Sequence, residues 1–137
     1  MIFFDTNVLV YSTVNLDENK QKTADRLIEQ AIKDKLFSAS PLVLGEFIFV
    51  LSKLNIDKKL VEKAISLYKP FVNYPLEPSM VLDAYELCSE LGLCKNINDA
   101  VHVKFAEKYC SRIVTFDGDF NKFKDLTSIK IEVLHSI

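Results

Sequence analysis

Short apolar runs that stop on polar residues alternate along this chain with longer segments of helical periodicity. The run Ile2–Phe4 stops at Asp5, and a second run at 113–116 stops at Asp117. A continuous apolar run of this length is typical of a strand that is buried on both faces of a parallel sheet. Further strands are predicted at 37–39 and 71–74, and alternating apolar positions predict a last one at 129–133.

Helical periodicity fills the stretches between these runs. Apolar positions recur at helical spacing at about 17–36, 41–54, 58–68, 78–91 and 98–109, and a short helix is expected near 120–123. Ser40 can cap the second of these helices, with Pro41 at its first position, and Asn98 can cap the one at 98–109. Helices therefore separate the strands. This order predicts right-handed crossovers and a three-layer α/β/α fold, with a mainly parallel central sheet of about four or five strands.

Composition limits the chain to one domain. It has 137 residues, 49% of them hydrophobic, with 3 Gly and 4 Pro and no linker-like stretch, so a single domain at 1–137 is expected. The three cysteines, Cys88, Cys94 and Cys110, lack the close pairing of zinc sites and are expected to be thiols. With neither a leader nor a membrane-length apolar run, a cytoplasmic protein without membrane contact is expected.

The formal net charge of -2 argues against a protein that coats nucleic acid with a broad basic face. A local site is still compatible with this charge. If four acids bind a cation, 17 Lys and Arg face the 15 remaining acids, a balance of +2. A polyanion could then dock beside the neutralised acids.

The acids that follow the apolar runs are the candidate chemistry. Because parallel strands end at one edge of a sheet, Asp5 and Asp117 are expected to lie close together there. Side-by-side carboxylates resist joint ionisation unless a cation neutralises them, which points to a metal site. Thr115 and Asn7 can orient these carboxylates by hydrogen bonding, as groups around metal ligands commonly do.

Two further acids lie near helix starts. Glu46 interrupts the apolar stretch 42–51, where a buried carboxylate needs a partner; it is either a ligand, a solvent-facing residue or the partner of an arginine elsewhere. Its neighbour Gly45 suggests a close backbone approach. Asp99 stands just inside a helix, where ordinary capping is the stronger interpretation for the residue alone. Asp119 is the better cap for the short helix that follows, and Asp117 the better ligand.

Taken together, these acids predict one cleft, because helices that follow parallel strands begin at the carboxyl edge of the sheet. A site of oxygen ligands without Cys or His favours Mg²⁺ or Mn²⁺ over Zn²⁺. His102, one turn beyond Asp99, is more often a structural residue than a ligand. Most lysines on amphipathic helices simply form a solvated face, although some can meet the phosphates of a polyanion; the candidates are Lys53, Lys58, Lys59, Lys95 and Lys104.

Four fragments resemble the PIN domain family, in particular the VapC-type toxins of prokaryotic toxin–antitoxin pairs. They are Asp-Thr-Asn at 5–7, Ser-Pro at 40–41 followed by Glu46, Asn-Asp-Ala at 98–100, and Thr-Phe-Asp-Gly-Asp-Phe at 115–120. Their order and spacing cover essentially the full length. The resemblance implies a PIN-like fold and a metal-dependent endoribonuclease that hydrolyses RNA, with Mg²⁺ or Mn²⁺ as cofactor.

The resemblance also implies roles for residues and partners. Asp5, Glu46, Asp99 and Asp117 match the family's acidic quartet, with Glu46 acting directly or through water and Asp119 as a further position. A homodimer and a small antitoxin that covers the active site are implied as well. Apolar residues such as Phe47, Phe49 and Leu54 could serve either interface. Two alternatives remain: a solitary RNA-processing nuclease, and a catalytically silent regulatory binding domain.

Overall fold

The computed structural model describes residues 1–135, and a four-stranded parallel sheet forms its centre. The strands are β1 (Ile2–Phe4), β2 (Phe37–Ser38), β3 (Arg112–Thr115) and β4 (Lys130–Val133), in the order β2-β1-β3-β4. β1 pairs with β3 so that Phe4 lies beside Val114. The predicted parallel sheet is confirmed, and its register sets the ends of β1 and β3 next to each other.

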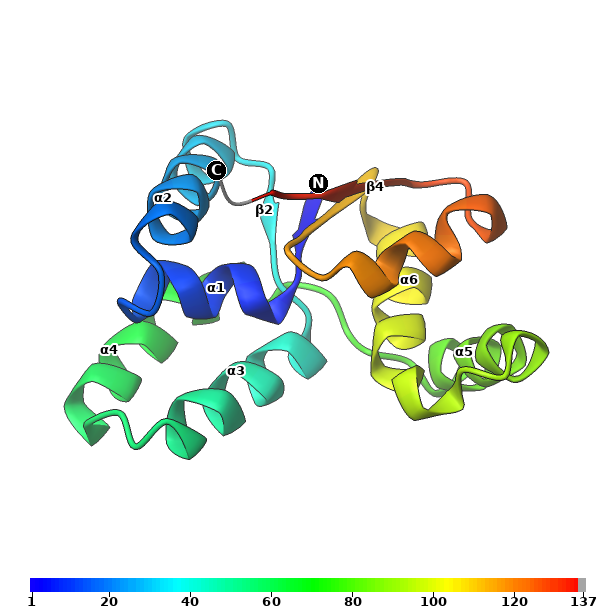
Figure 1. Cartoon of the computed structure of the whole chain (residues 1–137), viewed down its shortest axis with the longest axis horizontal. Helices are drawn as coiled ribbons and strands as arrows, with labels where there is room; N and C mark the ends of the chain where they lie inside the picture. Colours follow the sequence, from blue (N-terminus) through cyan, green and yellow to red (C-terminus); the bar gives the residue numbers. More distant parts are fainter. Residues whose placement is uncertain (136–137) are drawn as a thin grey trace.

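Six α-helices in the described residues cover this sheet on both faces, which confirms the predicted three-layer α/β/α arrangement. Figure 1 shows α1 to α4 on one side of the strands, with α5 and α6 on the other. The α-helices are α1 (Thr6–Thr13), α2 (Glu18–Lys33), α3 (Pro41–Lys53), α4 (Lys58–Tyr68), α5 (Pro78–Leu91) and α6 (Ile97–Tyr109). Short 3-10 helices lie at Lys69–Phe71, Cys94–Asn96 and Gly118–Leu126.

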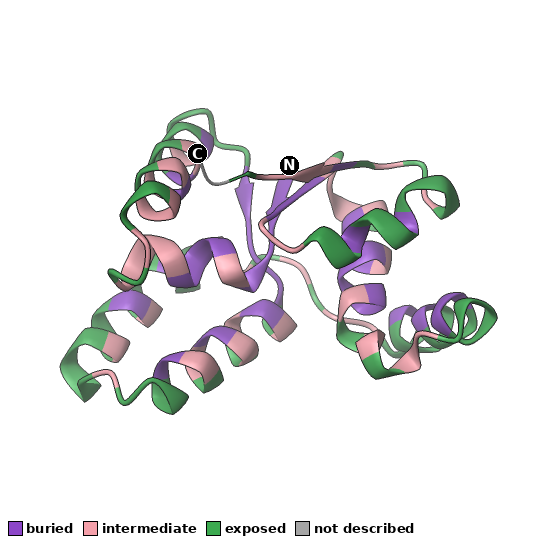
Figure 2. Cartoon of the chain, in the orientation of Figure 1, coloured by how far each residue is buried: buried purple, intermediate pink, exposed green. Residues whose placement is uncertain are grey.

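The core lies along the two central strands (Figure 2). Phe3 and Phe4 of β1 point to opposite faces, and both are fully or almost fully buried. Phe3 contacts the ring of Phe105 on α6, whereas Phe4 stacks on Phe37 of β2. Burial of one such side chain contributes about 1.5–3 kcal/mol. Apolar packing on both faces therefore holds the strand that ends at Asp5.

Helix α1 was not expected from the sequence. The segment is rich in β-branched residues and has a low helix propensity. It becomes helical because Asp5 caps it, accepting a hydrogen bond from the backbone N–H of Thr6, and because Val8, Leu9 and Val10 are buried in the core. Tertiary packing here outweighs the local preference.

The predicted strand at 71–74 is wrong. Among the described residues this segment makes one backbone hydrogen bond to the chain beside β2, which the Ala39 N–H donates to the Phe71 carbonyl at 3.2 Å. It forms no ladder of hydrogen bonds with β2. Pro70 and Pro75 flank the segment and have no N–H to donate. The predicted cap at Asn98 is also wrong, since α6 begins at Ile97 and the Asn98 side chain donates to Glu46 instead.

Two of the three expected thiols are paired. Cys88 and Cys94 form a disulfide, and Cys110 is free. Gly92 ends α5 in a left-handed conformation, with φ of 64°, and turns the chain back so that the two Cα atoms lie 4.9 Å apart. The spacing alone could not show this turn.

No helix in residues 1–135 is long and apolar enough to span a bilayer.

Candidate functional site

Asp5 lies at the end of β1, where it is 6% exposed. Its Oδ1 accepts the backbone N–H of Thr6 at 2.8 Å, and its Oδ2 accepts the hydroxyl of Thr115 at 2.7 Å. The second bond exists because β1 and β3 pair in parallel register, with Asp5 N–H donating to the Val114 carbonyl at 2.9 Å. The pairing thus fixes both oxygens of a buried carboxylate at the carboxyl edge of the sheet.

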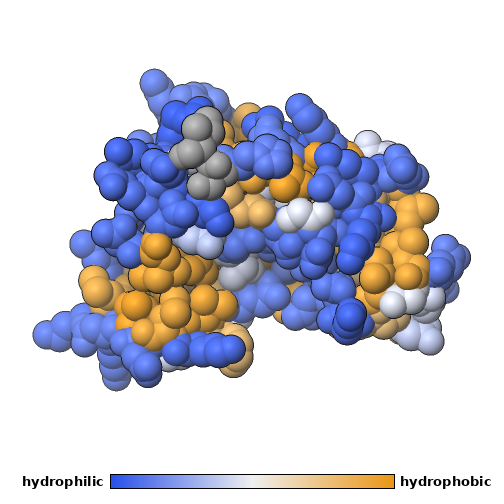
Figure 3. All heavy atoms as spheres, in the orientation of Figure 1, coloured by the Kyte–Doolittle hydropathy of each residue, from blue (hydrophilic) through white to orange (hydrophobic). Residues whose placement is uncertain are grey.

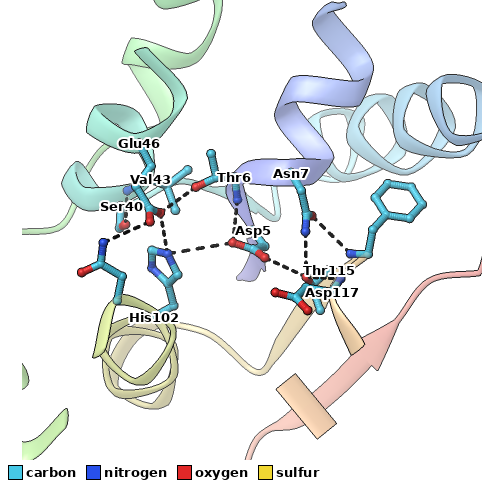
Figure 4. A network of polar contacts seen from close by, with 11 residues as sticks. Asp5, Thr6, Asn7, Ser40, Val43, Glu46, His102, Thr115 and Asp117 are labelled. Carbon is cyan, nitrogen blue, oxygen red and sulfur yellow. Dashed lines mark hydrogen bonds and ion pairs between the residues drawn. The ribbon is translucent and has the colours of Figure 1, made fainter. Parts of the chain in front are cut away.

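Asn7 and Thr115 connect Asp5 to Asp117 (Figure 4). Besides donating to Asp5, the Thr115 hydroxyl accepts the Asp117 backbone N–H at 2.9 Å and the Asn7 amide at 3.4 Å. Asn7 Oδ1 accepts the Phe116 N–H at 3.2 Å. These contacts hold the two strand ends in one arrangement, and the role of Asn7 and Thr115 in orienting metal ligands stays a prediction.

Asp117 also caps the 3-10 helix that follows β3, accepting the Asp119 backbone N–H at 2.9 Å. The expectation that Asp119 would be the cap is therefore wrong. The reason is that the chain turns immediately after β3, which brings the Asp119 N–H within reach of the Asp117 carboxylate. The Asp119 side chain is exposed and lies 3.8 Å from the Lys122 ammonium. Asp117 faces the other acids, and Asp119 does not contact them.

Glu46 reaches the site from α3, which begins where β2 ends. Its Oε1 accepts the Thr6 hydroxyl at 2.8 Å and lies 2.7 Å from His102 Nε2. Its Oε2 accepts the Asn98 amide at 3.2 Å. Glu46 is half-buried and has partners for both oxygens, so it is neither a free solvent-facing residue nor an arginine partner. The predicted close backbone approach at Gly45 is wrong, because nothing lies within 4 Å of a Cβ built there.

His102 is the residue whose importance the sequence did not reveal. Its side chain is buried, its Nε2 lies 3.9 Å from Asp5 Oδ1, and its Nδ1 has no hydrogen-bond partner in the described residues. Burial lowers the pKa of His102, but its hydrogen bond to the Glu46 carboxylate and the charges of Asp5 and Glu46 raise it above its ordinary value overall. The available signal was its position three residues after Asp99 on the same helix.

Asp99 lies in the first turn of α6, partly buried, with no hydrogen bond or ion pair to its side chain in the part of the chain that the structure describes. Burial and the nearby charge of Asp5 raise its pKa from 3.8 to about 6, and the carboxylates of Asp117 and Glu46 contribute to this shift. Asp99 therefore lies among the other three acids, which is the arrangement that its capping position alone could not establish.

The pKa values of Asp5 and Glu46 are shifted in opposite directions. Burial raises the pKa of Asp5 above its ordinary value, although His102 and the hydrogen bonds from Thr115 and Thr6 oppose the shift. Burial also raises the pKa of Glu46, but the hydrogen bond and charge of His102 hold it below its ordinary value. The neighbours of Glu46 therefore outweigh the effect of burial on its carboxylate, whereas those of Asp5 and Asp99 do not.

This arrangement fits a divalent cation. Within residues 1–135, neither Lys nor Arg makes an ion pair with Asp5, Glu46, Asp99 or Asp117, so their negative charge is balanced only by His102. One ligand atom from each of Asp5, Glu46 and His102 lies within 4.8 Å of the other two. Carboxylate oxygens are the preferred ligands of Mg²⁺ and Mn²⁺.

A groove of about 830 Å³ opens beside the acids, between α1 and α3. Asp5, Asn7 and Glu46 line one end of it, and its walls are mainly apolar. Phe49 is 66% exposed and Leu54 also lines the groove, whereas Phe47 is fully buried in the core and is not available to a partner. Figure 3 shows apolar side chains gathered on the surface in the region of α1, α3 and α4.

Comparison with known proteins decides the family. The model of the PIN domain matches residues 2–126. The chain belongs to the PIN domain family. No match was found among curated protein sequences.

Solved structures of similar fold agree with this assignment. VapBC2 from Rickettsia felis, crystallised with a promoter DNA fragment, aligns over 98% of this chain and 100% of the matched chain, with a TM-score of 0.70 and 20% identity. VapC20 from Mycobacterium tuberculosis, a toxin that cleaves the sarcin-ricin loop, aligns with a TM-score of 0.69 and 23% identity, over 89% of this chain and 94% of the matched chain. FitAcB from Neisseria gonorrhoeae aligns with a TM-score of 0.66 and 15% identity, over 96% of both chains. At these identities the likeness establishes the shared fold.

Proposed function

We propose that this PIN domain is a Mg²⁺- or Mn²⁺-dependent endoribonuclease and the toxin of a toxin–antitoxin pair. The observation that carries the proposal is the gathering of four acids, Asp5, Glu46, Asp99 and Asp117, none of which pairs with a lysine or arginine in the described residues. These carboxylates repel one another, which the raised pKa of Asp99 reflects, and a bound cation would relieve that repulsion. Membership of the PIN domain family and the VapC-type neighbours support nuclease activity.

On this proposal, Asp5, Asp99 and Asp117 would hold the metal, and Glu46 would contact it through water. A bound Mg²⁺ would supply a water of lowered pKa and stabilise charge on the phosphate oxygens. Thr115 keeps Asp5 oriented through its 2.7 Å hydrogen bond. Glu46 Oε1 has two donors, so Oε2, with a single amide donor at 3.2 Å, is the oxygen left to accept a proton of the attacking water.

The test is cleavage of a fluorogenic single-stranded RNA by the purified chain in Mg²⁺, Mn²⁺ or EDTA. Cleavage is expected with either metal and none with EDTA. Asp99→Asn and Asp117→Asn should reduce kcat by at least about 100-fold, since each removes a negative charge that holds the metal. Asp83→Asn, an exposed acid on α5, is the matched control and should cleave as the wild type does. Full activity in both site variants would refute the proposal.

Asp119→Asn tests the further position. Because this side chain is exposed, pairs with Lys122 and does not contact the other acids, we expect its kcat to stay within about threefold of the wild type. A loss as large as that of Asp117→Asn would return Asp119 to the metal site. The substitution leaves the cap of the 3-10 helix intact, because the Asp117 carboxylate accepts the backbone N–H of Asp119 and does not contact its side chain.

The toxin and its partners belong to the same proposal. The structural neighbours include VapBC2 and FitAcB, and the apolar groove beside the acids offers this chain a surface for a small antitoxin. The exposed apolar residues Leu82 and Tyr85 on α5 support a homodimer. Growth arrest on expression, relieved by a small neighbouring reading frame, is expected. RNA cleavage without growth arrest would favour a solitary processing nuclease, and neither cleavage nor metal binding would favour a silent binding domain.

A further inference from the structure

Three side chains form a compact group beside the groove, which we call the aromatic–lysine cluster: Tyr11, Lys20 and Phe116. The rings of Tyr11 and Phe116 meet edge to face, with centroids 5.2 Å apart. The Lys20 ammonium lies 4.8 Å from the centroid of Tyr11 and 5.6 Å from that of Phe116. All three side chains are only partly buried, so the cluster is in contact with solvent.

The cluster adjoins the acidic site. Tyr11 lines the groove together with Asp5 and Asn7. Phe116 follows Thr115 and precedes Asp117, and its N–H donates to Asn7 at 3.2 Å. A ligand that occupies the groove next to the acids therefore meets Tyr11, and through it reaches the edge of the cluster.

The charge of Lys20 has no carboxylate partner in the described residues. Lys20 stands in the first turn of α2, where the helix dipole disfavours a cation. Lys22 on the same helix instead pairs with Glu18 at 3.3 Å. The Lys20 ammonium is held against two aromatic rings, which positions a positive charge beside an acidic site without neutralising it.

A second pair of aromatic rings in the fold also has a lysine beside it, and its lysine pairs with a carboxylate. Tyr74 stacks on Tyr109 with centroids 4.4 Å apart, and the Lys108 ammonium lies 5.4 Å from the Tyr109 centroid. There, however, Lys108 is paired with Glu77 at 2.8 Å. This group lies at the opposite end of α6 from Asp99, and its lysine is neutralised by a carboxylate. The lysine of the aromatic–lysine cluster has no carboxylate partner in the described residues.

We propose that the aromatic–lysine cluster binds one nucleotide of an unpaired RNA segment next to the phosphate that is cleaved. A base stacks against Tyr11 and Phe116, and Lys20 contacts a backbone phosphate. Aromatic stacking requires a base that is not already stacked in a duplex, so the substrate class is single-stranded RNA or a loop. This inference rests on the proposed nuclease function and deepens it.

A peptide is the competing occupant of this part of the groove. Charge favours RNA, because the ammonium of Lys20 attracts phosphate and repels the lysine and arginine side chains that an acidic metal site would otherwise attract. The pairing of a cation with aromatic faces is also the combination by which proteins hold single-stranded nucleic acid without reading its sequence.

The experiment measures binding of a fluorescent ten-nucleotide single-stranded RNA by anisotropy, with Ca²⁺ replacing Mg²⁺, across a range of salt concentrations. Tyr11→Leu should weaken binding about tenfold. Tyr11→Phe keeps the ring and loses only the long hydrogen bond, 3.4 Å, from the Lys20 ammonium to the Tyr11 hydroxyl, so it should bind within about twofold of the wild type. Lys20→Gln should lower the slope of log Kd against log salt by about 0.7, the value for one phosphate contact on a single strand. Tyr74→Leu and Lys22→Gln are the matched controls and should change neither quantity.

The cluster assignment is overturned if Tyr11→Leu and Lys20→Gln bind RNA with the wild-type Kd and salt slope. It is equally overturned if these variants bind RNA normally and lose only inhibition by an antitoxin, since the surface then serves a protein. Cleavage in Mg²⁺ is scored separately. A wild-type chain that binds RNA through the cluster and never cleaves it would refute the proposed function while leaving the binding site intact.

Discussion

Replacing Asp99 by Asn should stabilise the metal-free protein while abolishing the proposed activity. The pKa of Asp99 rises from 3.8 to about 6, a difference of about 2 units. Each unit corresponds to about 1.4 kcal/mol, so removal of the charge is worth at most about 3 kcal/mol. Because Asp99 is partly exposed, solvent screening reduces this to about 1–2 kcal/mol, and loss of an acid in the first turn of α6 opposes it by roughly 0.3–1 kcal/mol. A net gain of about 1 kcal/mol is expected.

The dependence on pH identifies the cause. A carboxyl whose pKa is raised by folding holds its proton more tightly in the native state, so its ionisation destabilises the fold as pH increases from about 4 to 6. The penalty is complete above about pH 6.5 and absent below the unfolded pKa. The gain of Asp99→Asn should therefore be largest near pH 7.5 and should shrink steadily toward pH 4.

Urea unfolding followed by circular dichroism in EDTA, at pH 7.5, 6 and 5, measures the free energy of unfolding. Asp83→Asn serves as the control and should stay within about 0.5 kcal/mol of the wild type at every pH. With Mg²⁺ present, the wild type should regain stability and the advantage of Asp99→Asn should disappear. If Asp99→Asn is less stable than the wild type in EDTA at pH 7.5, or if its gain is the same at pH 5, then the acids do not repel one another as argued.

Three other perturbations test separate parts of the molecule. His102→Ala should reduce Mn²⁺ affinity or kcat about 10- to 100-fold by releasing Glu46, and His102→Gln, which keeps a donor, should recover part of that loss; a calorimetric titration with equal affinities would contradict this role. Gly45→Ala should raise the free energy of unfolding by about 0.5–1 kcal/mol, since nothing lies within 4 Å of the new Cβ, whereas Ala at Gly92, with φ of 64°, should lower it by about 1 kcal/mol; denaturant unfolding distinguishes the two signs. Millimolar Mg²⁺ should raise the thermal midpoint of the wild type and not that of Asp117→Asn, and equal shifts in a thermal scan would remove Asp117 from the metal site.

The strands and most helices could be predicted because burial leaves a periodic trace in the sequence. Helix α1 could not, since its residues Thr6–Thr13 favour a strand locally and follow directly after one. What makes it helical is the Asp5 cap and the packing of Val8 and Leu9, which depend on the rest of the fold. The mistaken strand at 71–74 has the opposite cause, because an apolar local pattern found no ladder to join.

The site was predictable in residue type and only partly in geometry. Acids at strand ends and helix starts predict a cleft, and the pKa of Asp99 supports the grouping. The contact between His102 and Glu46, 56 positions apart, leaves no mark in a single sequence. The sequence shows that Asp117 and Asp119 compete for one cap, but not that Asp117 takes it. Long-range contacts and single hydrogen bonds are set by packing, which periodicity does not record.

The four acids are not equivalent, and the difference suggests where a cation would lie. Glu46 accepts hydrogen bonds at both oxygens and has a lowered pKa, so the protein itself already stabilises its charge. Asp99 has no donor in the described chain and a raised pKa, which leaves its charge to be balanced from outside. A divalent ion gains most where the uncompensated charge is greatest. We therefore propose that Asp99, Asp5 and Asp117 would hold the metal directly, and that Glu46, whose carboxylate already has His102 as a partner at 2.7 Å, would contact it through water.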